Sequence, residues 1–295
     1  MGVSVPPLEE LDRWLAAREE TVVGLKPGVA AGIVWADPNH PTQTPVSIVY
    51  LHGYTASRGE IFPVPDRIAA ALGANLFYAR LRGHGLGANG HRNVTVEEWV
   101  EDGLEALEIG RRLGHQLVVL ATSTGATLAA WLILGPPRAS VAASIFVSPN
   151  LTPKNRLTEL LLWPGKEHLL KAVMGDTVTI PSKNELNSRY WDLTHHSHSL
   201  LPMMALVQKA RSLDFRKWPS PALVVYDPDD HVVDEKVTKK LFGRAPKALV
   251  TLHQWSGHKG EHHHVLAGEA LSPCGTAPMV ALGTDYLRRV LGPAT

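Results

Sequence analysis

After about Val29 the chain alternates between short apolar runs and segments whose apolar side chains recur at helical spacing. The apolar runs are rich in β-branched residues, which predicts strands at 29–35, 46–51, 75–81, 117–120, 141–147, 222–226 and 249–252. Helices are expected between them at 61–72, 95–113 and 126–134, and a closing helix carries Met279 to Leu291. Strands that alternate with helices become parallel neighbours, so the pattern predicts an α/β fold with a mostly parallel central sheet and helices on both faces.

The helix expected at 95–113 carries boundary signals at both ends. Thr95 followed by Glu98 is a capping box, in which each side chain bonds to the backbone N–H of the other residue. Arg111 and Arg112 lie in the last turn, where positive charge complements the helix dipole, and Gly114 is expected to end the helix.

Composition restricts the class of protein. The 295 residues are 44% apolar and 19% charged, which predicts a globular chain with a sizeable core, and we expect one domain over residues 1–295. The net charge is only +1 and no basic run is interleaved with aromatic residues, so nucleic acid is not an expected partner. No stretch approaches the roughly 20 apolar residues that cross a bilayer, so no membrane span is expected.

Cysteine usage and the first residues bear on location. Cys274 is the single cysteine, which excludes an internal disulfide. The chain does not start with basic residues followed by a long apolar core, and 8–17 has the pattern of a short amphipathic helix instead. Together these features predict a cytoplasmic protein. The sequence gives no indication of the oligomeric state.

A serine lies where an apolar run meets a helical run. The run that ends at Thr122 is followed by Ser123, and an Ala- and Leu-rich helical run begins at Ala126. Two small residues, Ala121 and Gly125, lie two positions before and after the serine. This strand, turn and helix pattern is typical of a nucleophile elbow, whose tight turn excludes bulky neighbours. The alternative is an ordinary helix N-cap.

A serine hydroxyl is a weak nucleophile unless a base takes its proton and another group orients that base. Asp227, Asp229 and Asp230 all follow the strand expected at 222–226. We assign the orienting role to Asp230, because it comes a turn beyond the strand and an apolar Val-Val pair follows it. Asp227 is expected to lie too close to the strand to reach the base. The alternative is that Asp-Pro-Asp-Asp is simply a turn.

The base is expected past the last strand, where the sequence is rich in histidine. We favour His264, because the apolar stretch that begins at Val265 would hold its backbone. The other candidates in this segment are His258, His262 and His263. Metal ligation is a further alternative, but consecutive histidines point in different directions and the spacing matches no His-x-x-x-His pair, so loop histidines are favoured over a metal site.

Two backbone N–H groups are candidates for binding an oxyanion. His52-Gly53-Tyr54 follows an expected strand, and Gly53 allows a turn that brings the Tyr54 N–H toward the serine. The Thr124 N–H, at the start of the helix after the serine, is the second donor. His52 is interpreted as a residue that holds the loop.

The alternation of strands and helices breaks between Pro149 and Leu206, where prolines occur among short helical pieces. Because this stretch lies between two expected strands of the sheet, we predict an inserted cap at 149–206 that forms part of a pocket. Its leucine, tryptophan and methionine side chains favour an apolar acyl or aryl ligand. The alternative is that they form the core of the cap itself.

Taken in their order along the chain, these motifs resemble the α/β-hydrolase superfamily. The resemblance covers nearly all of the chain after Val29 and is carried by His52-Gly53-Tyr54, the loop Arg82-Gly-His-Gly85, the Ser123 turn, Asp230 and His264-Val-Leu. Within the superfamily the chain is most similar to the capped carboxylesterase, monoacylglycerol-lipase-like and serine-aminopeptidase-like group. It departs from the usual pattern at Ala121 and Asp227, where related chains often have glycine.

The resemblance implies a serine hydrolase that cleaves small-molecule carboxylic esters through an acyl-enzyme. Ser123 would attack, His264 would act as general base and then acid, and Asp230 would orient His264. The Tyr54 and Thr124 N–H groups would form the oxyanion hole. No metal or organic cofactor is implied. Two alternatives stay open: a peptidase or amidase of the same fold, and a non-catalytic binding protein on that fold.

Overall fold

The computed structural model describes residues 4–163, 170, 174–257 and 261–292 and is built around a seven-stranded sheet. In spatial order its strands are β1 (Gly32–Val34), β3 (Asn75–Tyr78), β2 (Thr44–Leu51), β4 (Gly114–Thr122), β5 (Ala143–Val147), β8 (Ala222–Tyr226) and β9 (Val250–Gln254). Neighbouring strands are parallel except β1 and β3, which are antiparallel. The predicted mostly parallel sheet is confirmed.

Side chains of the central strands alternate between two apolar cores, one on each face of the sheet. In β2, Val49 and Leu51 belong to one core and Ile48 and Tyr50 to the other. Because both faces are covered, these strands are continuously apolar instead of alternating with polar residues. The parallel register pairs Leu51 with Ala121 of β4, so the ends of both strands lie at the same edge of the sheet.

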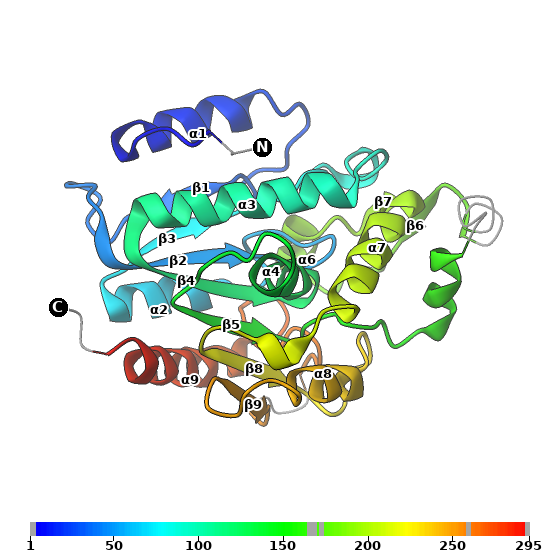
Figure 1. Ribbon diagram of the computed structural model, residues 1–295. Helices are drawn as coiled ribbons and strands as arrows, with labels where there is room; N and C mark the ends of the chain where they lie inside the picture. The colour runs from blue at the N-terminus through cyan, green and yellow to red at the C-terminus, as the bar shows by residue number, and fades with distance from the viewer. Residues whose placement is uncertain (1–3, 164–169, 171–173, 258–260, 293–295) are drawn as a thin grey trace.

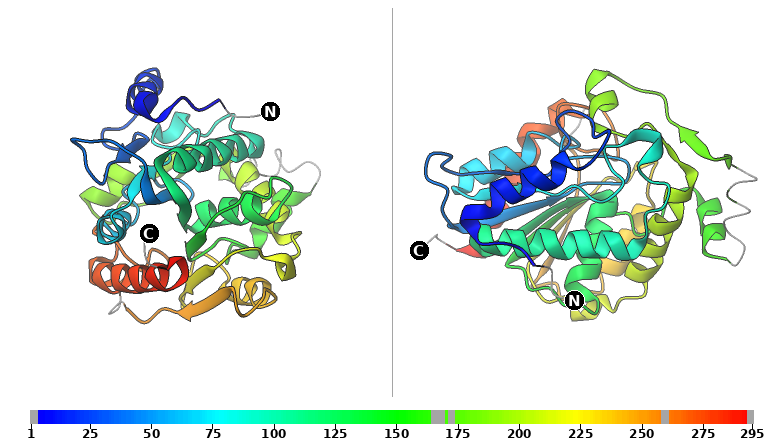
Figure 2. Two further views of the ribbon diagram at one scale, coloured as in Figure 1. Left: turned by 60° about the vertical axis from the view of Figure 1, so that its left-hand side comes forward. Right: turned by 90° about the horizontal axis from the view of Figure 1, so that it is seen from above.

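Helices cover both faces of the sheet (Figure 1, Figure 2). On one face, α2 (Val64–Leu72) and α9 (Pro273–Leu291) pack against each other and share a core. On the opposite face, α3 (Val96–Leu113), α4 (Ser123–Leu134) and α7 (Leu200–Arg211) share the other core. Helices on both faces were the arrangement predicted from the alternating pattern.

The N-terminal helix α1 and the short helix α8 are the remaining α-helices that the structure describes outside the cap segment. The predicted amphipathic N-terminal helix forms as a 3-10 turn, η1 (Leu8–Glu10), followed by α1 (Leu11–Glu20), whose Leu11 and Leu15 are buried. α8 (Glu235–Phe242) contacts β8 and β9. None of the helices in the described part of the chain is long and apolar enough to cross a bilayer.

The ends of α3 form as the capping signals predicted. The Thr95 side chain accepts the Glu98 N–H at 3.2 Å, and the Glu98 carboxylate accepts the Thr95 N–H at 2.8 Å. At the other end, Gly114 is in extended conformation and is also the first residue of β4. One residue therefore ends the helix and begins the strand that leads to the serine.

Three strands are shorter than predicted, and of these the strand expected at 141–147 loses only its first two residues, because β5 begins at Ala143. The strand expected at 29–35 is reduced to β1, because beyond Val34 the Ala36 N–H bonds to the side chain of Asn75 at 2.9 Å. The strand expected at 75–81 ends at Tyr78. Beyond it, the Arg80 guanidinium is held by the Glu19 carboxylate at 2.6 Å.

Between β5 and β8 the chain leaves the main sheet over the segment predicted as a cap. Its described elements are η3 (Arg156–Leu162), β6 (Thr177–Thr179), α6 (Glu185–Tyr190), β7 (Thr194–His196), η4 (Ser197–Ser199) and α7. β6 and β7 pair with each other as a separate antiparallel ribbon. Figure 1 shows this ribbon and α7 to the right of the main sheet, at the end where β2 and β4 finish.

Candidate active site

Ser123 lies at the sharp turn between β4 and α4. Its φ of 50° is in the left-handed region, which a residue other than glycine adopts only under strain. Two residues later, position 125 has no room for a side chain. A Cβ at Gly125 would lie 2.2 Å from the Leu51 carbonyl oxygen and 2.5 Å from that of His52. Ala121 is fully buried and fits where glycine is usual. The turn therefore presses the start of α4 against the end of β2.

Three buried side chains from separate loops form a hydrogen-bonded chain at this turn. His264 Nε2 lies 3.0 Å from Ser123 Oγ, and His264 Nδ1 lies 2.8 Å from Asp230 Oδ2. The other oxygen of Asp230 accepts the N–H groups of Val232 at 2.7 Å and Val233 at 2.9 Å. These are the three residues that the sequence selected, in the predicted order of contact.

The environment of Asp230 keeps its carboxyl group ionised. Burial by itself raises the pKa of a carboxyl group, but the charge and hydrogen bond of His264 and the two backbone N–H groups outweigh it, so the pKa of Asp230 is lowered. An ionised Asp230 accepts the Nδ1–H of His264 and leaves a lone pair on Nε2 that faces the serine.

The structure places the other histidine candidates differently. His263 Nδ1 lies 2.8 Å from Asp227 Oδ2, whereas the His264 ring bonds to Asp230, so Asp227 reaches a neighbouring histidine and not the expected base. Consecutive residues point in different directions, so His263 and His264 face different carboxylates. His262 turns its Nδ1 toward backbone N–H groups. His258 lies outside the described residues.

The loop after β2 runs directly beside the serine. A Cβ added to Gly53 would lie 2.5 Å from Glu60 Oε1 and 3.2 Å from the Ser123 Cβ, so the loop passes close to both side chains at a glycine. Tyr54 is the next residue, and its hydroxyl bonds to Ser199 Oγ at 2.5 Å. Thr124 is in the first turn of α4, where backbone N–H groups have no partner within the helix. Both predicted donors thus belong to segments that adjoin Ser123.

His52 holds this loop through hydrogen bonds of both its ring nitrogens, as predicted. Burial lowers its pKa to about 4, so the ring is neutral. Its Nδ1 bonds to the Gly53 carbonyl at 2.9 Å, and its Nε2 accepts the Leu81 N–H at 3.2 Å. This pairing requires the proton on Nδ1.

Glu60 is a site residue that sequence reasoning missed. Its buried carboxylate accepts the Gly53 N–H at 2.7 Å and the Tyr50 hydroxyl at 2.8 Å. The Tyr50 oxygen also lies 3.2 Å from Thr122 Oγ1, next to the serine. Burial raises the pKa of Glu60, although these hydrogen bonds oppose the shift. No motif marks this residue; the available signal is an acidic residue directly before the apolar stretch at 61–65.

Asp192 is a second missed residue, and it lies in the segment predicted as a cap. Its carboxylate accepts the N–H groups of Gly85 at 2.7 Å and Gly87 at 2.9 Å and contacts His91 Nε2 at 3.2 Å. Its own N–H donates to the Thr55 carbonyl at 2.7 Å. One buried residue thus joins the cap segment, the loop that contains Arg82-Gly-His-Gly85 and the loop after β2.

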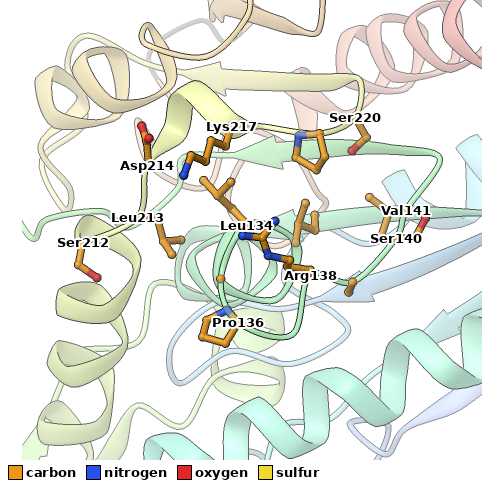
Figure 3. Close-up of a pocket in the computed structure, with 14 residues that line it drawn as sticks. Leu134, Pro136, Arg138, Ser140, Val141, Ser212, Leu213, Asp214, Lys217 and Ser220 are labelled. Carbon is orange, nitrogen blue, oxygen red and sulfur yellow. The ribbon is translucent and has the colours of Figure 1, made fainter.

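Two cavities of similar volume are lined by residues other than Ser123, Asp230 and His264. An apolar groove of about 460 Å³ in the cap segment is lined by Asn155, Leu157, Thr158, Leu160, Leu161, Leu170, Met174 and Leu200. A second cavity, of about 490 Å³, lies at the C-terminal end of α4, where Arg138 and Lys217 reach into it (Figure 3). Ser123 begins that 12-residue helix, which is about 18 Å long, so the second cavity is remote from the serine.

Among the residues that the structure describes, one group has the proximity required of metal ligands. Ligand atoms of Asp227, Asp229 and His263 lie within 4.8 Å of one another. Asp227 and His263 already bond to each other, and Asp229 is exposed. The group therefore carries no metal assignment.

Comparison with known proteins gives one family and a set of similar structures. A sequence model described as the alpha/beta hydrolase family matches residues 48–271. One of the metagenome-derived lipolytic enzymes LipS and LipT aligns with a TM-score of 0.69 at 16% identity, over 90% of this chain and 99% of that one. A soluble variant of monoglyceride lipase from Saccharomyces cerevisiae, solved with a substrate analogue, aligns with a TM-score of 0.65 at 12% identity, over 89% and 92%.

A third similar structure is Est1E from Butyrivibrio proteoclasticus with bound ferulic acid, at a TM-score of 0.60 and 14% identity, over 88% of this chain and 94% of that one. No curated protein matches the sequence. At these identities, the structural likeness shows a shared fold.

Proposed function

The chain belongs to the alpha/beta hydrolase family, and we propose that it is a serine hydrolase that cleaves carboxylic esters through an acyl-enzyme intermediate. The observation that carries the proposal is the unbroken hydrogen-bonded chain from Ser123 Oγ through both nitrogens of His264 to Asp230. All three side chains are buried, and the serine is strained at a strand-to-helix turn. A helix N-cap has no need of such a chain.

The first half of the reaction forms the acyl-enzyme. Ser123 Oγ attacks the carbonyl carbon of the ester, and its proton passes to His264 Nε2 across 3.0 Å. Asp230 keeps the other ring nitrogen protonated and stabilises the imidazolium that forms. The tetrahedral intermediate then expels the alcohol, which takes the proton from Nε2.

The second half returns the enzyme to its starting state. His264 Nε2 takes a proton from water, and the resulting hydroxide attacks the acyl carbon. The second tetrahedral intermediate releases the carboxylic acid, and Ser123 Oγ regains its proton from Nε2.

The oxyanion of both intermediates is assigned to the backbone N–H groups of Tyr54 and Thr124. The close approach of Gly53 to the Ser123 Cβ supports this assignment, because it brings the loop after β2 to the serine. Glu60 accepts the Gly53 N–H, and His52 bonds to the Gly53 carbonyl, which belongs to the same peptide group as the Tyr54 N–H. A donor that is already oriented needs no reorganisation as the charge develops.

The substrate is proposed to carry an apolar acyl or aryl group. The apolar groove of the cap segment supports this, and we propose that residues 149–206 act as a cap within a single domain over residues 1–295. A series of p-nitrophenyl esters of increasing chain length tests the substrate class. We expect kcat/KM to rise with chain length before it falls; a flat response, or one that is highest for acetate, would contradict an apolar acyl site.

The proposed mechanism is tested with a fluorophosphonate probe followed by peptide mapping. We expect stoichiometric labelling of Ser123 in the wild type and none in S123A. Folded protein that takes up no probe would remove the serine mechanism and leave the non-catalytic binding protein. A matched ester and anilide of the same acid separate the esterase from the peptidase alternative, because equal rates on both would favour the amidase.

A further inference from the structure

His262 makes an unusual pair of contacts beside the proposed base. Its Nδ1 accepts two backbone N–H groups, those of His264 and Val265, each at 3.1 Å. A single side-chain atom thus holds the peptide of His264 itself and the next peptide. The imidazole makes these contacts two and three residues ahead of its own position, within one turn of the loop.

We propose that His262 is a positioning residue, whose Nδ1 atom fixes the backbone of His264 so that both nitrogens of the His264 ring reach their partners. The proposal rests on the function proposed above, because it assigns to His262 a part in setting the geometry of the general base. His262 itself touches neither Ser123 nor the site of reaction. It acts through His264.

The protonation state of His262 suits this part. A ring nitrogen accepts a hydrogen bond only with a free lone pair, so Nδ1 must be unprotonated and the ring neutral. Burial lowers the pKa of His262 to about 3, and the positive charge of Lys183 acts in the same direction, against the opposing charge of Asp230. The lone pair is therefore present throughout the neutral and mildly acidic range.

The contact has the geometry of a side-chain turn. In asparagine and aspartate the Oδ1 atom is joined to Cα through Cβ and Cγ, and it commonly accepts the N–H two residues further along. Nδ1 of histidine is joined to Cα through the same two atoms. His262 thus takes the place of an asparagine, with a larger ring that also packs 5.0 Å, centre to centre, from the ring of His231.

The rest of the loop is held from the opposite side. Ser272 Oγ donates to the Val265 carbonyl at 2.5 Å, and Val265 and Leu266 are buried in the core beneath α2 and α9. His262 thus fixes the N–H groups of His264 and Val265, and Ser272 fixes the carbonyl of Val265. This matters because the two partners of the His264 ring come from different elements, the α4 turn and the loop after β8.

The substitutions H262A, H262N and H262Q separate the contact from the bulk of the side chain. Asparagine presents an acceptor at the position of Nδ1, glutamine presents its polar atoms one bond further out, and alanine presents none. Misplacement of a reacting group by about 1 Å costs about 100-fold in rate, so we expect kcat to fall by about 10- to 100-fold in H262A and H262Q with little change in KM. H262N should retain kcat within about threefold of the wild type.

Two readouts are required, one of which does not depend on turnover. The first is kcat and KM for one ester, with the rate of fluorophosphonate labelling of Ser123. The second is the low-field proton resonance of the His264 Nδ1–H bonded to Asp230, assigned by its loss in D230N. We expect the resonance in the wild type and H262N and its broadening or loss in H262A and H262Q.

Equal kcat values and equal resonances in the three His262 variants, whether all as in the wild type or all reduced, would overturn the proposal, even where Ser123 is labelled normally. Failure of the proposed function has a different signature. The wild type then shows no labelling of Ser123, while the resonance still reports whether His262 holds the ring.

Discussion

Gly125→Ala is the most direct test of how α4 and the loop after β2 are fitted together. The added Cβ would meet the Leu51 carbonyl oxygen at 2.2 Å, the His52 carbonyl oxygen at 2.5 Å and the Leu51 carbonyl carbon at 2.6 Å. All three atoms are backbone atoms, and β2 is paired with β3 on one side and β4 on the other. No rotation of a side chain can relieve the contact.

The size of the effect follows from these distances. Ordinary contact of a Cβ begins at 3.4 Å, so the nearest oxygen is too close by about 1.2 Å. Overpacking of a core costs about 1–3 kcal/mol, and contacts with backbone favour the upper end. At about 2 °C per kcal/mol for a chain of this size, the Tm should fall by about 6 °C. A shift of about 1 Å in the loop beside Ser123 should lower kcat by about 100-fold.

Thermal unfolding and ester hydrolysis are measured together on Gly125→Ala and on the matched variant Gly103→Ala. A Cβ at Gly103, on α3, would meet Leu132 Cδ1 at 2.6 Å and Leu128 Cδ2 at 3.1 Å, which are the ends of flexible side chains. We expect Gly103→Ala to lose some stability and keep its kcat. A wild-type kcat in Gly125→Ala would refute the argument that this glycine sets the distance between α4 and the loop after β2.

Four further outcomes are expected. D230N should lower kcat by about 10⁴-fold, because an amide at this position favours the wrong tautomer of the base; steady-state kinetics check this. Because the pKa of Asp230 is lowered on folding, its stabilising effect is present above its ordinary pKa of 3.8 and is lost as pH falls through the folded pKa. The free energies of urea unfolding of the wild type and D230N should therefore converge at acid pH. The pKa of Glu60 is raised on folding, so the pH dependence of its effect on stability has the opposite sign. The stabilising effect of Glu60 is complete below its ordinary pKa of 4.5 and is lost as pH rises through the folded pKa. E60Q should therefore gain stability relative to the wild type over that rise in pH, and a constant difference in the free energy of unfolding would contradict the raised pKa. D192A should destabilise the fold by about 3 kcal/mol, because two glycine N–H groups lose their acceptor; a Tm within 1–2 °C of wild type would count against that role.

Local sequence signals predicted most of the elements and the central residues of the site. The β4–Ser123–α4 turn is readable because its small residues, Ala121 and Gly125, lie within five positions of the chain, although the backbone that Gly125 must avoid belongs to Leu51 and His52. Asp230 and His264 could be selected because each follows a recognisable strand and precedes apolar residues that anchor its loop. The capping box of α3 formed as predicted for the same reason, since its two partners are three residues apart.

Position relative to a strand was a less reliable guide for neighbouring side chains. Asp227 was expected not to reach the base, and His264 indeed bonds to Asp230, but the bond of Asp227 to His263 was not foreseen. Sequence order indicates where a loop lies, but not which way each successive side chain of that loop points. That direction depends on backbone angles held by distant contacts, such as the bond from Ser272 to Val265.

The sequence by itself determined the alternating elements, the serine turn and the order of serine, acid and histidine, because each is marked by a short pattern of residues near in the chain. Only the tertiary structure decided which polar residues support them. Asp192 meets Gly85 across 107 positions, and Glu60 reaches the Gly53 N–H because the chain folds back beneath the loop. A buried carboxylate or imidazole is stable only where donors or acceptors converge on it, and that convergence belongs to the packed fold.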